Sequence, residues 1–173
     1  MARPKKNIKL ILSIVFLSFS SFFFMSPGEA SISLNITAVQ SGSFTATNSN
    51  FTLTFPDYLS GTVSNTFFVT YTVSANNVTR VSSVITGSLS GLYTGINLQA
   101  SFGAYTQTGG NATLTASPTG FVTIGTANTG FANKVGSGKI LSGSFPVTYR
   151  AVATADLTPQ TISKTLTITF FDT

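Results

Sequence analysis

The sequence predicts an all-β protein built as an antiparallel β-sandwich, and three observations support that prediction. Apolar and polar residues alternate along short runs through most of the chain, which is the period of a strand with one buried face. The polar positions are mostly Thr and Ser, which suit the wet face of an antiparallel sheet. No segment places apolar residues at helical spacing over three turns.

The first 30 residues differ from the rest and predict a secretory signal peptide. Four of the nine Lys and Arg residues fall within the first nine positions, and an apolar run from Ile8 to Met25 follows. Small residues at Gly28 and Ala30 then form a cleavage site. The alternative is an uncleaved membrane anchor, for which the run is slightly short. We expect cleavage after Ala30 and export to the periplasm, the cell surface or the medium, with the membrane involved only during export.

Residues 31–173 are expected to form one domain of eight or nine strands. Turn-forming Gly, Pro, Asn and Asp residues separate the runs. In chain order, the runs are residues 32–38, 51–55, 67–73, 81–91, 96–104, 114–116, 121–124, 141–151 and 162–170. Their alternation predicts an inward-facing set of Phe51, Leu53, Phe55, Val69, Tyr71, Leu98, Phe102, Val147, Tyr149, Leu166 and Ile168. This pattern favours an immunoglobulin-like, Greek-key sandwich, with a jelly roll or a closed barrel as alternatives.

Residues 126–139 are the longest stretch without alternation. They are rich in Gly and carry Lys134 and Lys139, so we expect an exposed loop. The segment Gly136-Ser137-Gly138-Lys139 lacks the spacing of a phosphate-binding loop, and a strand rather than a helix is expected after it.

The composition argues against most chemistry. The chain has no His and no Cys, which excludes His-dependent catalytic triads and the usual zinc ligands. Beyond the leader, the only carboxylates are Asp57, Asp156 and Asp172, and each is expected to serve a turn or the chain end. Five scattered cations cannot form a nucleic-acid-binding stripe. We therefore expect neither an enzyme nor a cofactor, metal or nucleic-acid site.

The two ends of the predicted domain resemble those of bacterial pilin or fimbrial subunits. Residues 149–170 are similar to the closing strands of chaperone–usher and spore-coat-U-like subunits, which end in a loop followed by a Thr-rich alternating strand. The chain departs from that pattern in lacking a disulfide, in having Asp172 where these subunits tend to have Tyr, and in having Gln160 at the usual Gly. The resemblance implies a structural or adhesive subunit that associates with itself or with other surface proteins.

The first strand after the leader offers a means of assembly. Residues 31–39 carry no charge, and the segment alternates through Ile32, Leu34, Ile36 and Ala38. Such a strand can add to the sheet edge of a neighbouring copy, with alternate side chains entering pockets. The simpler interpretation, which the sequence favours, is that it forms the first strand of its own domain.

A secreted carbohydrate-binding or adhesin module is the alternative function. Its candidate sugar-stacking residues are Tyr58, Tyr93 and Tyr105, which are expected near turns or on the polar side of strands. Several coplanar, exposed rings on one face would favour glycan binding, whereas a groove lacking a strand would favour a pilin-like subunit.

Overall fold

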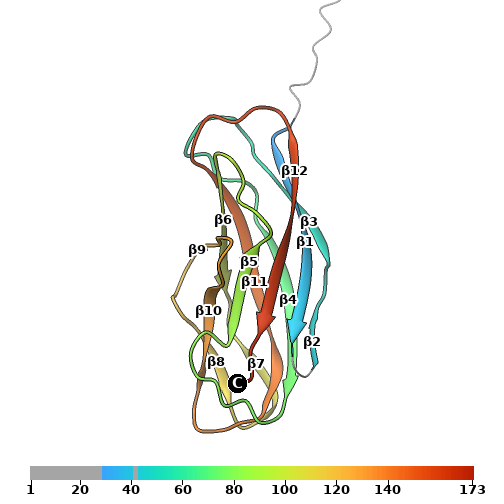
Figure 1. Ribbon diagram of the computed structural model, residues 1–173, viewed down its shortest axis with the longest axis vertical. Coiled ribbons are helices and arrows are strands. Elements are labelled where there is room, and N and C mark those ends of the chain that lie inside the picture. The colour runs from blue at the N-terminus through green and yellow to red at the C-terminus, as the bar shows by residue number, and fades with distance from the viewer. Residues whose placement is uncertain (1–28, 41–42) are drawn as a thin grey trace, which may run out of the picture.

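The computed structural model describes residues 29–40 and 43–173 and shows an all-β molecule (Figure 1). Apart from Glu29 and Ala30, the predicted signal peptide lies outside the described residues. The twelve strands of the described ranges are β1 (Ser31–Gln40), β2 (Ser43–Ala46), β3 (Asn50–Thr54), β4 (Phe67–Ala75), β5 (Ile85–Leu89), β6 (Ile96–Phe102), β7 (Thr106–Gly110), β8 (Thr113–Ala116), β9 (Val122–Thr123), β10 (Thr129–Val135), β11 (Leu141–Ala153) and β12 (Thr161–Phe170).

The strands form two sheets that pack face to face, as the sequence predicted. The first sheet has the order β3-β1-β12-β5-β10-β8, and the second has the order β2-β4-β11-β6-β9, with β7 also paired to β11. All neighbouring strands are antiparallel except β1 and β12, which run parallel to each other. The predicted antiparallel β-sandwich is therefore confirmed, with one parallel pair inside it.

The core lies between the sheets and contains every residue of the predicted inward-facing set. In β11, buried and half-buried positions alternate along all 13 residues, so one face of this central strand covers the core. Aromatic rings stack within the core. The ring centroid of Phe145 lies 4.5 Å from that of Phe102 and 5.6 Å from that of Tyr71. Burial of each large apolar side chain stabilises the folded state by about 1.5–3 kcal/mol. Such a core can stabilise a domain that has no disulfide.

The expectation of an exposed loop at residues 126–139 is wrong for its central part. Strand β10 lies there, between β5 and β8, and Phe131 and Ala132 are both buried. A register shift between Gly130 and Ala132 breaks the alternation, because a bulge places two successive residues against one partner. The ring of Phe131 lies on Gly87 of β5, where an added β-carbon would come within 2.5 Å of the ring.

The loops gather at two ends of the sandwich. The leader end comprises residues 55–66 and 154–160, joined by bonds such as Leu157 N–H to the Tyr58 carbonyl at 2.7 Å. The C-terminal end comprises residues 76–84, 136–140 and 171–173, joined by bonds such as Val78 N–H to the Lys139 carbonyl at 2.7 Å. Strand β12 runs from the first end to the second (Figure 1).

Candidate strand-exchange site

Strand β1 is the first described strand, yet it lies inside its sheet, between β3 and β12. Ser31 to Gln40 pair in parallel with Thr161 to Phe170, and Ser31 to Asn35 pair antiparallel with residues 50–54. The two neighbours of β1 are not paired with each other. Both edges of β1 are therefore occupied over its first five residues, and the segment completes the sheet.

The side chains of β1 divide between the core and the surface as alternation requires. Ile32 and Leu34 are fully buried, Ser33 is half-buried and Asn35 is exposed. Ile36 and Ala38 align with Leu166 and Ile168 of β12, but their side chains lie outside the described residues. The favoured interpretation, that β1 is a strand of its own domain, is confirmed for the isolated chain.

The removal of β1 would leave a groove with the properties of an acceptor site. The backbone edges of β3 and β12 that face β1 would lose their partners, and such unpaired edges are templates for another strand. Leu53 and Leu166 are fully buried at 0% exposure beside β1, so the groove would be apolar. A second copy of the β1 segment would satisfy the same backbone groups and fill the same apolar space.

This site is almost uncharged. Lys164, which aligns with Leu34, is the one charged residue within β1, β3 and β12. At the start of the strand, the hydroxyls of Ser31 and Thr161 are hydrogen-bonded at 2.9 Å, and the Ser31 N–H donates to the Gln160 carbonyl at 2.9 Å. Strand pairing here depends on backbone bonds and apolar burial, neither of which salt screens strongly.

The three candidate sugar-stacking tyrosines do not form an exposed platform. Tyr93 is only 5% exposed, and its hydroxyl donates to the Ser33 carbonyl at 3.4 Å. Burial raises the pKa of Tyr93. Tyr93 lies beside a turn, as expected, but its ring packs into the core while its hydroxyl reaches a backbone acceptor, so the ring is not exposed for stacking on a sugar.

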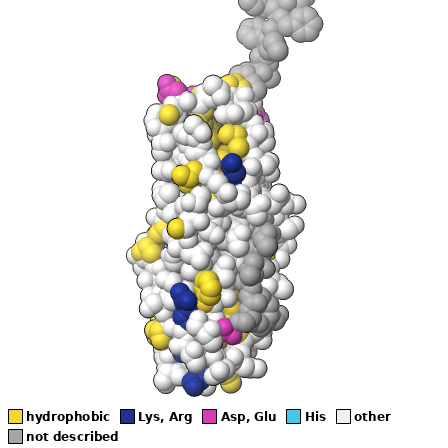
Figure 2. Space-filling view, in the orientation of Figure 1, with side chains coloured by type: hydrophobic (Ala, Val, Ile, Leu, Met, Phe, Trp, Pro, Cys, Tyr) yellow, Lys and Arg dark blue, Asp and Glu magenta, His cyan; other side chains and the backbone are white. Residues whose placement is uncertain are grey.

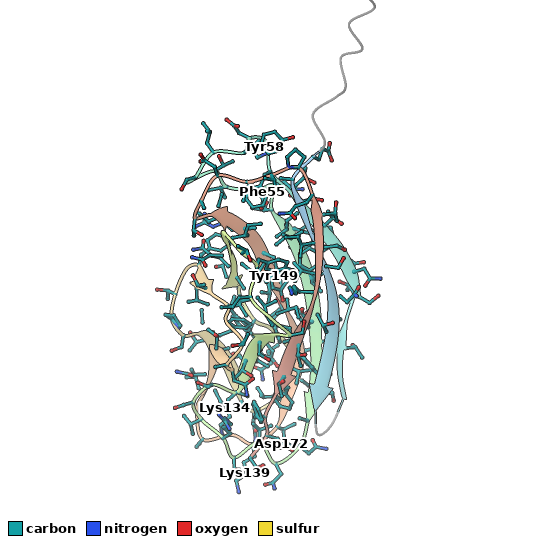
Figure 3. All side chains as sticks on the ribbon, turned by 45° about the horizontal axis from the view of Figure 1, so that its top comes forward. Phe55, Tyr58, Lys134, Lys139, Tyr149 and Asp172 are labelled. Atoms are coloured by element: carbon teal, nitrogen blue, oxygen red, sulfur yellow. The ribbon has the colours of Figure 1, made fainter. Side chains whose placement is uncertain are left out.

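Tyr58 and Tyr105 are both half-buried against the core, at separate places. Tyr58 lies in the leader-end loop (Figure 3), where it lines an open hollow with Phe55, Pro56 and Val63. Tyr105 lies beside Gly143 of β11, and burial raises its pKa. Because the rings are dispersed and one is buried, the structure gives the carbohydrate-binding alternative little support.

Two of the three carboxylates bind backbone groups of loops. An Asp57 side-chain oxygen accepts the Tyr58 N–H at 2.6 Å, and one of Asp156 accepts the Ser60 N–H at 2.9 Å. Within residues 29–40 and 43–173, no group of three acidic, His or Cys side chains could hold a metal ion.

A scan against protein-family models gave no match for this chain, and a search of curated proteins gave none either. In the part of the chain that the structure describes, no helix is long and apolar enough to cross a membrane.

Sequence reasoning identified the β1 segment but not its neighbours. Alternation shows which face of a strand is buried, and it contains no information about which strand lies alongside. The signal that could have located β1 is the matched length and spacing of residues 31–40 and 161–170, which share the same apolar period.

Proposed function

We propose that this protein is an exported structural subunit of a bacterial surface fibre or extracellular matrix, assembled by exchange of β1 between copies. The observation that carries the proposal is the position of β1. It is an uncharged strand directly after the predicted leader, and it fills a groove between two strands that do not pair with each other. The predicted partners are other copies of the chain or other surface proteins.

The groove is filled by the chain's own strand, which sets conditions for assembly. A neighbour's strand can enter only after the resident β1 leaves, or while the domain is still folding. Exchange replaces the contacts of β1 with equivalent ones from another copy, so the gain in free energy is small and the barrier is the loss of a central strand. Such exchange of identical elements is a known route to oligomers.

A substitution inside β1 cannot test exchange by itself. Leu34→Asp would place an unpaired charge in the chain's own core, where Leu34 is fully buried. The variant is expected to unfold, so it would not distinguish a donated strand from an ordinary one.

A disulfide that holds β1 in the sheet of its own chain provides the test. The chain contains no cysteine of its own, so two introduced cysteines can pair only with each other. Ser33 of β1 and Thr52 of β3 are direct partners, and both point away from the core. The pair Ser33→Cys and Thr52→Cys is expected to form a disulfide, since direct antiparallel partners lie within its reach. If multimers that resist salt and detergent require β1 to leave, the oxidised protein forms none of them, and a reductant restores them.

The matched control locks two strands that stay together in the proposal. Ser144 of β11 and Thr72 of β4 are also direct antiparallel partners. As in the first pair, the serine is half-buried and the threonine is exposed. Oxidised Ser144→Cys/Thr72→Cys protein is expected to assemble like the unsubstituted chain. Detergent-resistant multimers formed by the oxidised β1 lock at the control's rate would exclude strand exchange, and an unsubstituted chain that never assembles would exclude the structural-subunit proposal itself.

A further inference from the structure

The two ends of the sandwich differ chemically from its flanks. The predicted cleavage after Ala30 removes Glu29 and leaves eight charged residues, of which six lie at or next to an end. The leader end has Asp57 and Asp156, and the C-terminal end has Arg80, Lys134, Lys139 and Asp172. Figure 2 shows acidic side chains at its upper end and Lys or Arg side chains toward its lower end, and Figure 3 labels Lys134, Lys139 and Asp172 there. One end is therefore acidic, the other is mainly basic, and the Ser- and Thr-rich flanks between them are nearly uncharged.

Exposed apolar side chains are also concentrated at the ends. Leu59 and Val63 of the leader end are 60% and 40% exposed, whereas Val81, Val135 and Ile140 at the C-terminal end are 58%, 46% and 41% exposed. Of the other three exposed large hydrophobic residues, Phe68 and Phe121 lie outside these two ends. Leu92 lies in the β5–β6 loop, in which the Gly95 carbonyl accepts the Thr154 N–H of the leader end at 2.8 Å. Apolar groups interspersed with charges are typical of protein–protein contact surfaces.

At the basic end, charged and apolar residues are adjacent and held in place. Arg80 precedes Val81, and Lys139 precedes Ile140. The guanidinium of Arg80 lies 4.6 Å from the ring centroid of Phe171, and its backbone N–H donates to the Asp172 carbonyl at 3.1 Å. A fixed surface of this kind loses little conformational entropy when a partner binds.

We propose that the leader end of one copy docks against the C-terminal end of the next. The occupant of each end is a second copy of this chain, because Asp57 and Asp156 with Leu59 complement Arg80 and Lys139 in charge and in apolar character. Contact between two like ends would bring charges of the same sign together, which is unfavourable. Contact between unlike ends is heterologous and leaves a free end at each side, so it extends into a filament along the long axis of the sandwich.

This inference uses a surface separate from the β1 groove and can hold or fail independently of strand exchange. Its test is therefore made in the oxidised Ser33→Cys/Thr52→Cys protein, in which β1 is fixed. Sedimentation velocity at increasing concentration is expected to show reversible, elongated oligomers. Because the contact is partly ionic, added salt is expected to weaken it.

Two single substitutions compare how association depends on the leader end and on the flank of the sandwich. Leu59→Lys adds a basic group to a 60% exposed apolar site at the acidic leader end, and Phe68→Lys makes the same change at a 66% exposed site on β4. Leu59→Lys removes an apolar contact and places a like charge against the basic end, so it is expected to raise the concentration needed for association by about tenfold or more. Phe68→Lys is expected to leave that concentration unchanged. If the oxidised lock misfolds, the same comparison is made without the two cysteines.

Charge reversal gives a second measurement at the opposite end. Lys139→Glu at the C-terminal end is expected to weaken association, whereas Lys164→Glu on the β12 flank is expected to have no effect. A locked protein that sediments as a monomer at every concentration would overturn the proposal, as would equal effects of Leu59→Lys and Phe68→Lys.

Discussion

The hydroxyl groups of Tyr71 and Tyr149 lie 2.8 Å apart in the middle of the core. Tyr149 occupies the centre of the molecule (Figure 3). Burial is the main cause that raises the pKa of both phenols, and the hydrogen bond between them lowers the pKa of Tyr71 while raising that of Tyr149. The pair is a polar element in an otherwise apolar core, and each hydroxyl serves as the other's partner.

This pair predicts a loss of stability in alkaline solution. In the folded chain both groups stay protonated, whereas in the unfolded chain each loses its proton near pH 10. The unfolded state then binds fewer protons, so the free energy of unfolding falls as pH rises above about 10 and is unaffected below about 9. Urea unfolding across this range should show the fall, and Tyr71→Phe/Tyr149→Phe should reduce its slope. An equally steep fall in that variant would contradict the assignment.

Leu166 tests the predicted register of the last strand. It is fully buried on β12 beside β1, so Leu166→Ala is expected to lower the free energy of unfolding by about 2–5 kcal/mol. The neighbouring Thr167 is half-buried, and Thr167→Ala should cost no more than about 1 kcal/mol. Denaturant unfolding of the two variants makes the comparison, and equal effects would show that the strand faces the other way.

At the scale of single elements, the link between the predicted leader and β1 bears on whether the leader can be cleaved before or after the domain folds. Ala30 is 2% exposed, and its carbonyl accepts the Phe55 N–H at 3.0 Å. Ser31 is 8% exposed and pairs with both neighbouring strands. A peptidase needs an extended, accessible segment, and the Ala30–Ser31 bond joins two buried residues at the start of β1. If the predicted leader is cleaved after Ala30, we therefore expect cleavage to precede folding of the domain.

We predict that the exported chain begins at Ser31-Ile32 and that the folded full-length protein resists the same cut. N-terminal sequencing and intact mass identify the exported product, and signal peptidase is added to folded and to denatured full-length protein. Cleavage of the denatured sample alone is expected. Recovery of the full-length chain from a membrane fraction would contradict cleavage, and equal cutting of both samples would contradict the order.

The strands differ in how well the sequence predicts them. β11 alternates along its whole length, and β12 alternates from Thr165 to Phe170 after a break at Lys164, so their inward faces follow from the residues. β7, with the sequence Thr-Gln-Thr-Gly-Gly, has no apolar residue to reveal a period, and β10 has its period broken by a bulge. The parallel pairing of β1 with β12 depends on the topology of the whole chain, which alternation does not encode. The burial of Tyr93 likewise depends on packing between distant segments.

At the scale of the whole molecule, a disulfide-free sandwich holds its first strand between two strands that do not pair with each other. Its flanks are rich in Ser and Thr and carry only Arg150 and Lys164 among the charged residues of the described ranges, and its two ends differ in charge. These features agree with the proposed role of a subunit that joins other copies. If β1 is exchanged, backbone ladders and buried side chains hold the copies together, so multimers should resist salt and dissociate only when the domains unfold.

Electron microscopy of the exported protein, combined with gel electrophoresis of unheated and boiled samples, tests the structural-subunit proposal most directly. We predict filaments, with a ladder of multimers in the unheated detergent sample that collapses to one monomer band after boiling. Single compact particles at every concentration, with only the monomer band before heating, would contradict the proposal.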